Sequence, residues 1–467
     1  MKKDWRDVVF WAGVIGLSAS IIVLGVLILK YTVFSKKNDN RDLGGLEVTF
    51  LDWWTGESFG EANSDYEKAL LKMLHKAEAE HDFTFKRMSI PECGWGQDYI
   101  EFAADSILNN NPVASLILLD SRWVGRFAEK DLLLDVSKST VVNFDDAKWN
   151  KAVREVMSYN GGIYGFAAGV TAENVTGVFF NKEIFRMFGL NDELVYDLQK
   201  EGKWNWDTFT ELCKSLTKDI DNDGVTDIYA VAGVDETVVN AVLVSNDTYV
   251  IKRDEAGLWK VNADDPRVLH AFDFIHELTD GGYYMPVPQG DDWWWEWSKE
   301  AFTQSRTALY IDEEWQGSRL SGWSGEEIDF GFVAFPYGPD VGHPVAVIRE
   351  NIVIIPNCDA TRDLLDDILY AYDWYTTVPE EYRKSDESWK VALSYKEADS
   401  RTIDETLRMV VSEWPLLMNP GNSFGEDRNV YWCGELINGM SSREVLRTYE
   451  SVWQAEANQY NKTTQPK

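Results

Sequence analysis

The sequence lacks the short motifs that carry most enzyme chemistry. It has no HExxH zinc motif, no GxSxG nucleophile turn, no P-loop and no clean GxGxxG dinucleotide fingerprint. Its five histidines form no metal-binding pattern. The residues therefore indicate no catalytic centre. A pair of carboxylates acting on glycosides stays open, because only geometry reveals such a pair.

Cysteine is scarce, and its spacing excludes the common zinc sites. Cys93, Cys213, Cys358 and Cys433 lie far apart and include no CxxC pair. Cys213 falls on the apolar side of a helical pattern, so we expect a buried free thiol there. Up to two disulfides fit the count, and the sequence leaves their pairing open.

Positive charge is in short supply relative to negative charge. The chain has 45 Lys and Arg against 78 Asp and Glu, a formal net charge of -33. Such a surface repels phosphate backbones, so we expect no nucleic-acid partner. A hydrophobic content of 45% over 467 residues, with 21 Trp, supports a large core and more than one lobe.

Charge is absent altogether from Val8 to Leu29. A helix of this length rises about 1.5 Å per residue and crosses a hydrocarbon core of roughly 30 Å. We expect residues 1–45 to form a single-pass N-terminal membrane anchor and its linker. A cleaved signal peptide is the alternative. Basic residues flank both ends, so the positive-inside rule does not decide the orientation.

The body that follows alternates strand and helix patterns. Strands are predicted at 46–54, 83–88 and 114–120, and an amphipathic helix at 64–81. The run "ASLILLD" is apolar throughout, which is typical of a strand covered on both faces of a parallel sheet. The pattern predicts an α/β fold.

Beyond its α/β pattern, the body resembles the bacterial extracellular solute-binding proteins that serve carbohydrate ABC importers. The order and spacing of several segments carry the resemblance. They are "LEVTFLDWW", "SLILLDSRWVGRFAEKDLLLDVSK", "GGIYGFAAGVTAENVTGVFFNKEIFRMFGL", "WNWDTFTELCKSLTKDIDNDGVTDIYA", "FTQSRTALYIDEEW" and "IDFGFVAFPYGPD".

The resemblance implies a two-lobed, type II periplasmic-binding-protein-like fold with a ligand cleft between the lobes. Crossings between the lobes would fall near Phe166–Thr171, Phe332–Pro336 and Arg349–Ile354. Lobe 1 would then comprise 46–168 with 335–351, and lobe 2 would comprise 169–334 with 352–467.

The resemblance also implies a function. The body would lie outside the cell, capture a carbohydrate by lobe closure and deliver it to ABC permease subunits, as a monomer without a required cofactor. The chain departs from most Gram-positive relatives in having no lipid-accepting cysteine after its apolar segment. A membrane-anchored sensing subunit and a glycoside-acting enzyme remain as alternatives.

Carbohydrate sites combine aromatic platforms with hydrogen-bonding groups. Residues of both kinds fall at strand ends and at positions that the family uses, and each has core or surface packing as an alternative role. The candidates are Asp52, Trp53, Trp54, Asp120, Arg122, Glu173, Asn174, Asp312, Glu313, Trp315, Tyr431 and Trp432.

The stretch "DDWWWEWSKEAF" adds four tryptophans within five positions. Trp293 and Trp297 are four residues apart and share one face of a helix, so they join the ligand-binding candidates. A platform at the rim of the cleft would suit an oligosaccharide. Packing between the lobes is the alternative.

The segment "DIDNDGVTD" has the spacing of a calcium-binding loop. Asp219, Asp221, Asp223 and Asp227 occupy positions 1, 3, 5 and 9, with a glycine at position 6. Position 12 is Ala230, where such loops place a bidentate glutamate. A structural Ca²⁺ and an Asx-rich turn are both compatible with this pattern.

Overall fold

The computed structural model describes most of the chain after residue 40. The described residues are 41–55, 60, 62, 65–146, 148–168, 175–256, 258–287, 296–320, 328–347, 351–380, 411–413 and 432–464. None of the helices within them is both long enough and apolar enough to span a membrane. The predicted anchor at Val8–Leu29 lies outside these residues.

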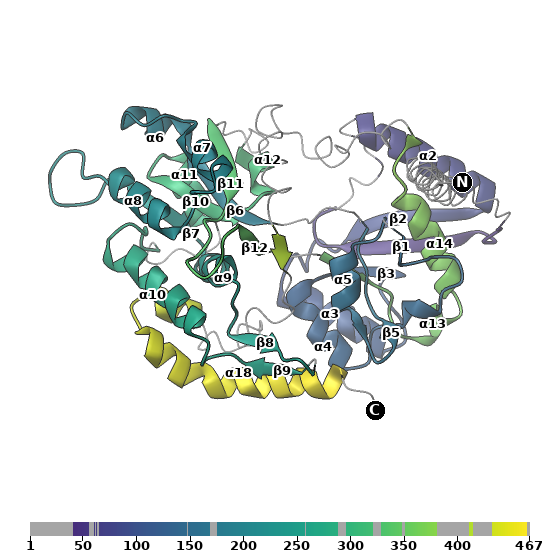
Figure 1. The fold of residues 1–467 in the computed structure, drawn as a ribbon. Coiled ribbons are helices and arrows are strands. Elements are labelled where there is room, and N and C mark those ends of the chain that lie inside the picture. The colour runs from purple at the N-terminus through teal and green to yellow at the C-terminus, as the bar shows by residue number, and fades with distance from the viewer. Residues whose placement is uncertain are drawn as a thin grey trace, which may run out of the picture.

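The first lobe is built on a four-stranded sheet in the order β13-β3-β1-β2 (Figure 1). β1 (Leu46–Asp52) pairs in parallel with β2 (Phe83–Ser89) and β3 (Leu116–Asp120), and β13 (Asn351–Ile354) runs antiparallel to β3. All five residues of β3 are buried, as its continuous apolar run predicts.

Helices cover both faces of this sheet because the strands alternate their side chains. Val48 and Phe50 pack with α2 (Asp65–His81) and α14 (Leu365–Tyr375), while Leu51 faces the opposite core. The lobe also contains α3 (Gln97–Leu108) and several shorter elements. The shorter elements are η1 (Ser121–Trp123), α4 (Val124–Glu129), η2 (Val136–Lys138), α5 (Lys151–Val156), β4 (Ser158–Tyr159), β5 (Gly162–Ile163) and α13 (Asp359–Arg362).

The second lobe has its own sheet in the order β11-β6-β10-β7. β6 (Thr176–Asn181) is antiparallel to β10 (Thr307–Glu313) and to β11 (Phe330–Ala334), whereas β7 (Tyr229–Gly233) is parallel to β10. All residues of β6, β10 and β11 are buried, so this sheet is also covered on both faces.

The other elements of lobe 2 surround that sheet. They are α6 (Lys182–Met187), α7 (Leu194–Lys200), α8 (Trp206–Leu216), α9 (Asp235–Ser245), β8 (Ile251–Arg253), β9 (Trp259–Val261), α10 (Pro266–Asp280), α11 (Trp297–Thr303), α12 (Gln316–Leu320), β12 (Val345–Val347), β14 (Val411–Glu413), α17 (Trp432–Ile437) and α18 (Ser442–Thr464). The thiol of Cys213 on α8 is buried in the core, as predicted, and all four cysteines are free.

The chain divides between the lobes differently from the expected division. Phe335 packs in the lobe 2 core, and the backbone N–H of Gly338 donates to the carbonyl of Ser245 at 2.8 Å, so the predicted crossing at Phe332–Pro336 is wrong. Residues 335–347 stay with lobe 2. Residues 351–375 belong to lobe 1, because β13 completes its sheet and α14 covers it.

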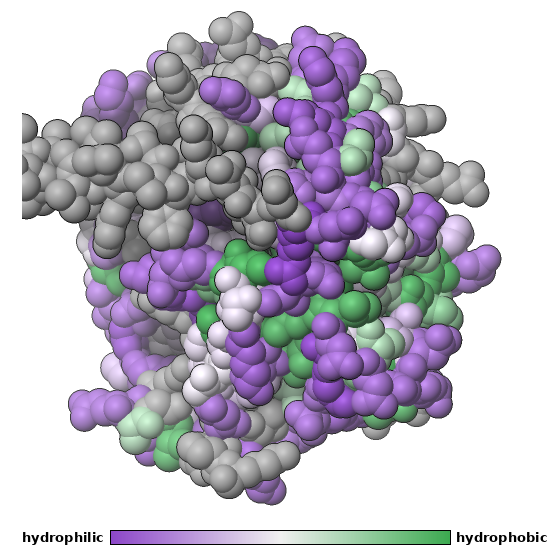
Figure 2. Space-filling view, turned by 90° about the vertical axis from the view of Figure 1, so that its right-hand side faces the viewer, coloured by the Kyte–Doolittle hydropathy of each residue, from purple (hydrophilic) through white to green (hydrophobic). Residues whose placement is uncertain are grey.

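Two crossings fall within short stretches. The chain passes from lobe 1 to lobe 2 between Ala168 and Val175, and it returns between Val347 and Asn351. It ends in lobe 2 with α18, which runs along the lower side in Figure 1 and reaches α4 of lobe 1. Figure 2 looks onto the outer face of lobe 1, where hydrophilic residues surround a group of hydrophobic ones near the middle of the view.

Candidate functional site

The chain crossings bring one edge of each sheet toward the other lobe. In lobe 1, Asn351 starts β13 opposite Asp120, at the carboxyl end of β3. In lobe 2, Thr176 starts β6 opposite Glu313, at the carboxyl end of β10. Each crossing spans about four to seven residues, which reach at most about 14–24 Å. Short crossings therefore limit how far apart the two edges can lie, and ligands of open α/β sheets collect at such carboxyl ends.

The lobe 1 edge carries a connected group of five aromatic rings. Trp53 makes edge contacts with Trp54, Tyr99 and Trp123 at centroid distances of 5.0, 5.6 and 5.4 Å, and Trp95 lies 5.4 Å from Trp123. Trp54 is 53% exposed and Trp95 is 38% exposed, whereas Tyr99 and Trp123 are buried. The two exposed indoles offer flat apolar surface of the kind that binds the C–H faces of sugars.

Asp52 fixes the turn that carries Trp54. Its buried carboxylate accepts hydrogen bonds from the backbone N–H groups of Trp54 and Thr55, both at 2.8 Å, and pairs with the guanidinium of Arg87. Burial alone would lower the pKa of Arg87, but Tyr375 and Asp52 raise it. Predicted as a ligand contact, Asp52 is instead fully buried and bonded within the protein.

Two further candidates lie at the carboxyl end of β3. Asp120 ends the strand and is buried at the same edge as Trp123. The side chain of Arg122 lies outside the described part of the structure.

The lobe 2 edge carries carboxylates. Asp312 and Glu313, at the end of β10, and Glu314 after them are all buried. Asp312 accepts hydrogen bonds from the Tyr310 hydroxyl and, at 3.2 Å, from the Gln316 amide. Burial raises the pKa of Tyr310, and the neighbouring Asp312 carboxylate raises it further. The phenol therefore keeps its proton and remains a hydrogen-bond donor.

Trp315, a predicted ligand contact, lies at the lobe 2 edge. Its Nε1 donates to Glu313 at 2.6 Å, which ties the ring to the end of β10. α12, which begins at the next residue, lies on the side of lobe 2 that faces lobe 1 (Figure 1).

More acids from neighbouring elements extend this edge. Asp235 and Glu236 begin α9 directly after β7, and both are buried. Glu296, just before α11, is also buried and pairs with Lys299 at 2.6 Å and Arg319 at 2.7 Å. Because β7 is the parallel neighbour of β10, Asp235 lies beside the end of β10.

Burial corrects two predicted ligand contacts. Trp297 is 2% exposed and packs in a core with Met285 and Ala301, so the packing alternative holds for this ring. Trp432 is fully buried against Trp453. The other candidates named from the sequence lie outside the described residues. They are Glu173, Asn174, Trp293 and Tyr431.

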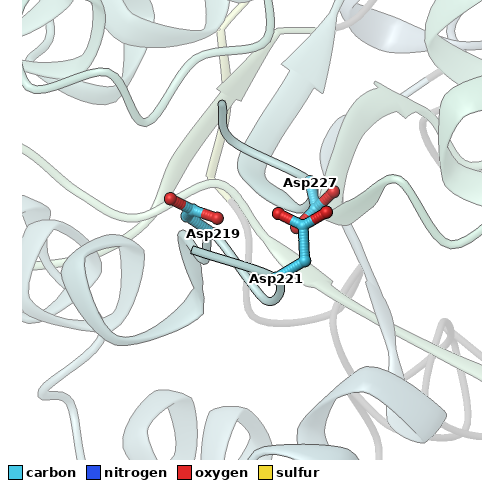
Figure 3. A group of neighbouring side chains, drawn as sticks. All are labelled: Asp219, Asp221 and Asp227. Carbon is cyan, nitrogen blue, oxygen red and sulfur yellow. The ribbon is translucent and has the colours of Figure 1, made fainter. Parts of the chain in front are cut away.

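Three of the four aspartates in the calcium-like loop come together (Figure 3). Carboxylate oxygens of Asp219, Asp221 and Asp227 lie within 4.8 Å of one another, and all three residues are exposed. Asp223 is not in this group, and it accepts from the backbone of Val225 at 2.7 Å. Backbone N–H groups also donate to Asp219 and Asp227, so an Asx-type turn accounts for part of the loop.

A family model described as "Bacterial extracellular solute-binding protein" matches residues 96–379, from the start of α3 to just beyond α14. The chain belongs to this family. The matched part of this solute-binding protein covers both sheets except β1 and β2. No curated protein matches the sequence.

Solved structures share the fold of this solute-binding protein. The cyclic α-maltosyl-1,6-maltose binding protein from Arthrobacter globiformis is 16% identical, with a TM-score of 0.62 over 89% of this chain and 99% of that one. The maltose/maltodextrin-binding domain MalE from Bdellovibrio bacteriovorus, bound to maltotriose, is 13% identical, with a TM-score of 0.59 over 88% and 100%. Lmo0181 from Listeria monocytogenes, in complex with cycloalternan, is 16% identical, with a TM-score of 0.58 over 90% and 100%.

Sequence reasoning missed several residues at these edges. The rule that singled out Asp52 and Asp120, a polar residue at the end of an apolar strand, also applies to Asp235 after β7. Trp95 precedes α3 and gives no local signal. Arg87 falls on the same face of β2 as the buried Phe83 and Phe85, so an arginine at an inward position of the strand was the signal that could have found it. Only the folded arrangement places these last two beside Trp123 and Trp54.

Proposed function

We propose that this solute-binding protein captures an oligosaccharide between its two lobes and presents it to the permease of an ABC importer. The observation that carries the proposal is the pairing of two unlike edges. Lobe 1 offers the exposed indoles of Trp54 and Trp95, and lobe 2 offers the carboxylates at the carboxyl end of β10. Sugars need both, since their C–H faces stack on rings and their hydroxyls bond to acids.

Closure is central to this proposal. Contacts from both lobes reach the ligand together only when the lobes approach, so binding favours the closed state. The solved structures with this fold include proteins named for maltotriose, cycloalternan and mannotriose complexes, which supports a glycan of several units. The ligand is bound and released unchanged.

The same proposal assigns the N-terminal segment. Val8–Leu29 is a single-pass anchor that holds the body outside the cell, in place of the lipid used by relatives, and the body acts as a monomer. Expression of the full chain followed by alkaline extraction of membranes tests the anchor. Recovery of the full-length protein in the soluble fraction would contradict it.

Thermal unfolding of residues 45–467 with maltotriose, cycloalternan and mannotriose tests ligand capture. A sugar that binds only the folded state adds about 2.7 kcal/mol at a hundredfold excess over Kd. We expect a raised melting temperature and a change in tryptophan fluorescence with at least one glycan, which is recovered intact. Trp54→Ala should abolish the fluorescence change. No shift with any glycan, from a protein that melts cooperatively, would contradict the carbohydrate proposal.

A further inference from the structure

Arg87 lies behind the most exposed indole of the lobe 1 edge. It comes from β2, and its guanidinium carbon lies 5.0 Å from the ring centroid of Trp54 and 5.5 Å from that of Phe50. Its Nε pairs with Asp52, and its Nη1 donates to the Tyr375 hydroxyl at 3.1 Å. The guanidinium is therefore held by β1, by the turn after it and by α14, and has little freedom to move.

The Asp52 carboxylate holds the backbone of Trp54 directly and its ring indirectly, through Arg87. One oxygen of Asp52 accepts from the N–H groups of Trp54 and Thr55, and the other pairs with Arg87. A cation over an indole face is attracted by the ring quadrupole. Trp54 is more than half exposed, yet its main chain is bonded to the buried Asp52 and one face of its ring lies against the partly buried Arg87.

We propose that Arg87 is a positioning residue that holds Trp54 ready as a one-faced platform for the ligand. This inference rests on the proposed function. The apolar face of the sugar packs on the ring face opposite the guanidinium, and Arg87 itself does not touch the ligand. A ring that is already ordered binds with less loss of side-chain entropy than one that becomes ordered on binding.

The rival explanation is that Arg87 serves only to neutralise the buried Asp52. Arg87→Met alone does not separate the two roles, because it leaves a buried carboxylate without its cation and threatens folding. The double variant Asp52→Asn with Arg87→Met removes both charges. The asparagine that this variant carries keeps a side-chain oxygen, which accepts from the N–H groups of Trp54 and Thr55.

The first measurement needs no ligand. Fluorine NMR of the protein labelled with 5-fluorotryptophan reports each indole, and the Trp54 signal is assigned by its loss in Trp54→Phe. We expect the double variant to move the Trp54 signal toward the position of free tryptophan and to leave most others in place. The matched control is Arg186→Met, which removes an exposed arginine paired with Asp192 and Asp329 in lobe 2. It should leave the Trp54 signal unchanged.

The second measurement is a mutant cycle on affinity, by calorimetry with whichever of maltotriose, cycloalternan and mannotriose binds. We expect the double variant to weaken binding roughly three- to tenfold, the equivalent of one side chain ordered on binding. In the Trp54→Ala background the same two changes should have no further effect, because Arg87 acts through Trp54.

The outcomes separate this inference from the function on which it rests. An unmoved Trp54 signal in a folded double variant would overturn it, as would an equal loss of affinity with and without Trp54. If no sugar binds but the Trp54 signal moves, the carbohydrate function fails while the positioning of Trp54 by Arg87 stands.

Discussion

Asp235→Asn should make the protein more stable at neutral pH, although it removes a charge from the candidate site. Asp235 is 8% exposed at the start of α9. Burial raises its pKa from an ordinary 3.8 to about 6 and outweighs the hydrogen bond from the Tyr284 hydroxyl at 3.2 Å, which lowers it. The folded protein thus holds this carboxylate in an unfavourable setting once it is ionised.

The sign and size of this change in stability follow from the linkage between proton binding and folding. Between pH 4 and 6 the folded state keeps a proton that the unfolded state has released, so the stability of the wild type falls as pH rises through this window. A pKa difference of this size between the two states corresponds to about 3 kcal/mol. The asparagine side chain of the variant cannot ionise and can still accept from Tyr284. The gain in unfolding free energy should approach about 3 kcal/mol above pH 6 and vanish below pH 4.

Urea unfolding of wild type and variant at half-unit steps from pH 4 to 8 measures this difference. Asp265→Asn is the control of opposite sign. Burial opposes the ionisation of Asp265, but hydrogen bonds from Arg267 and Asn262 outweigh it and lower its pKa to about 2. Its stabilising contribution is present above pH 4 and is lost as pH falls toward 2, so Asp265→Asn should destabilise the protein at pH 7. A difference for Asp235→Asn that does not change between pH 4 and 7 would refute the reasoning.

Three further predictions concern the tryptophans and the acidic loop. Trp432→Ala should cost about 3–5 kcal/mol in urea unfolding, because it empties a fully buried site, yet leave sugar affinity unchanged where the protein is folded; a selective loss of affinity would restore its predicted ligand role. Trp54→Ala should do the reverse, with a stability change within about 1 kcal/mol and a large loss of affinity by calorimetry. Millimolar Ca²⁺ should raise the melting temperature, and Asp221→Asn should abolish the rise while Asp223→Asn does not; equal effects of the two variants would refute a site at the three converging carboxylates.

Local pattern predicted the elements of lobe 1 well. The alternation of "LEVTFLD" and the unbroken apolar run of "LILLD" each fix which faces of a strand are covered, and both strands form within two residues of the predicted ends. The helix at Asp65–His81 follows from its apolar stripe in the same way. These signals are local, so they can be interpreted without knowing which elements pack against each strand or helix.

The division of the chain and the fate of the tryptophans were not local properties. β13 has an ordinary apolar pattern, and only its pairing with β3 assigns it to lobe 1. Trp297 and Trp54 are the same residue type in similar polar surroundings along the chain. One is enclosed by Met285 and Ala301, and the other remains exposed above Arg87, because of which elements fold over each. Sequence spacing carries no information about which elements will pack over a given side chain.

The two edges also explain why a single lobe is a poor carbohydrate site. The lobe 1 edge supplies rings with two buried acids, Asp52 and Asp120, of which Asp52 is bonded to Arg87. The lobe 2 edge supplies acids with the partly buried ring of Trp315. A sugar held by lobe 1 alone would stack but leave most hydroxyls in water, and one held by lobe 2 alone would lose its largest apolar contact. Because the stacking rings lie on one lobe and the hydrogen-bonding acids on the other, the full free energy of binding is gained only after closure. That coupling lets a transporter distinguish a loaded binding protein from an empty one by shape.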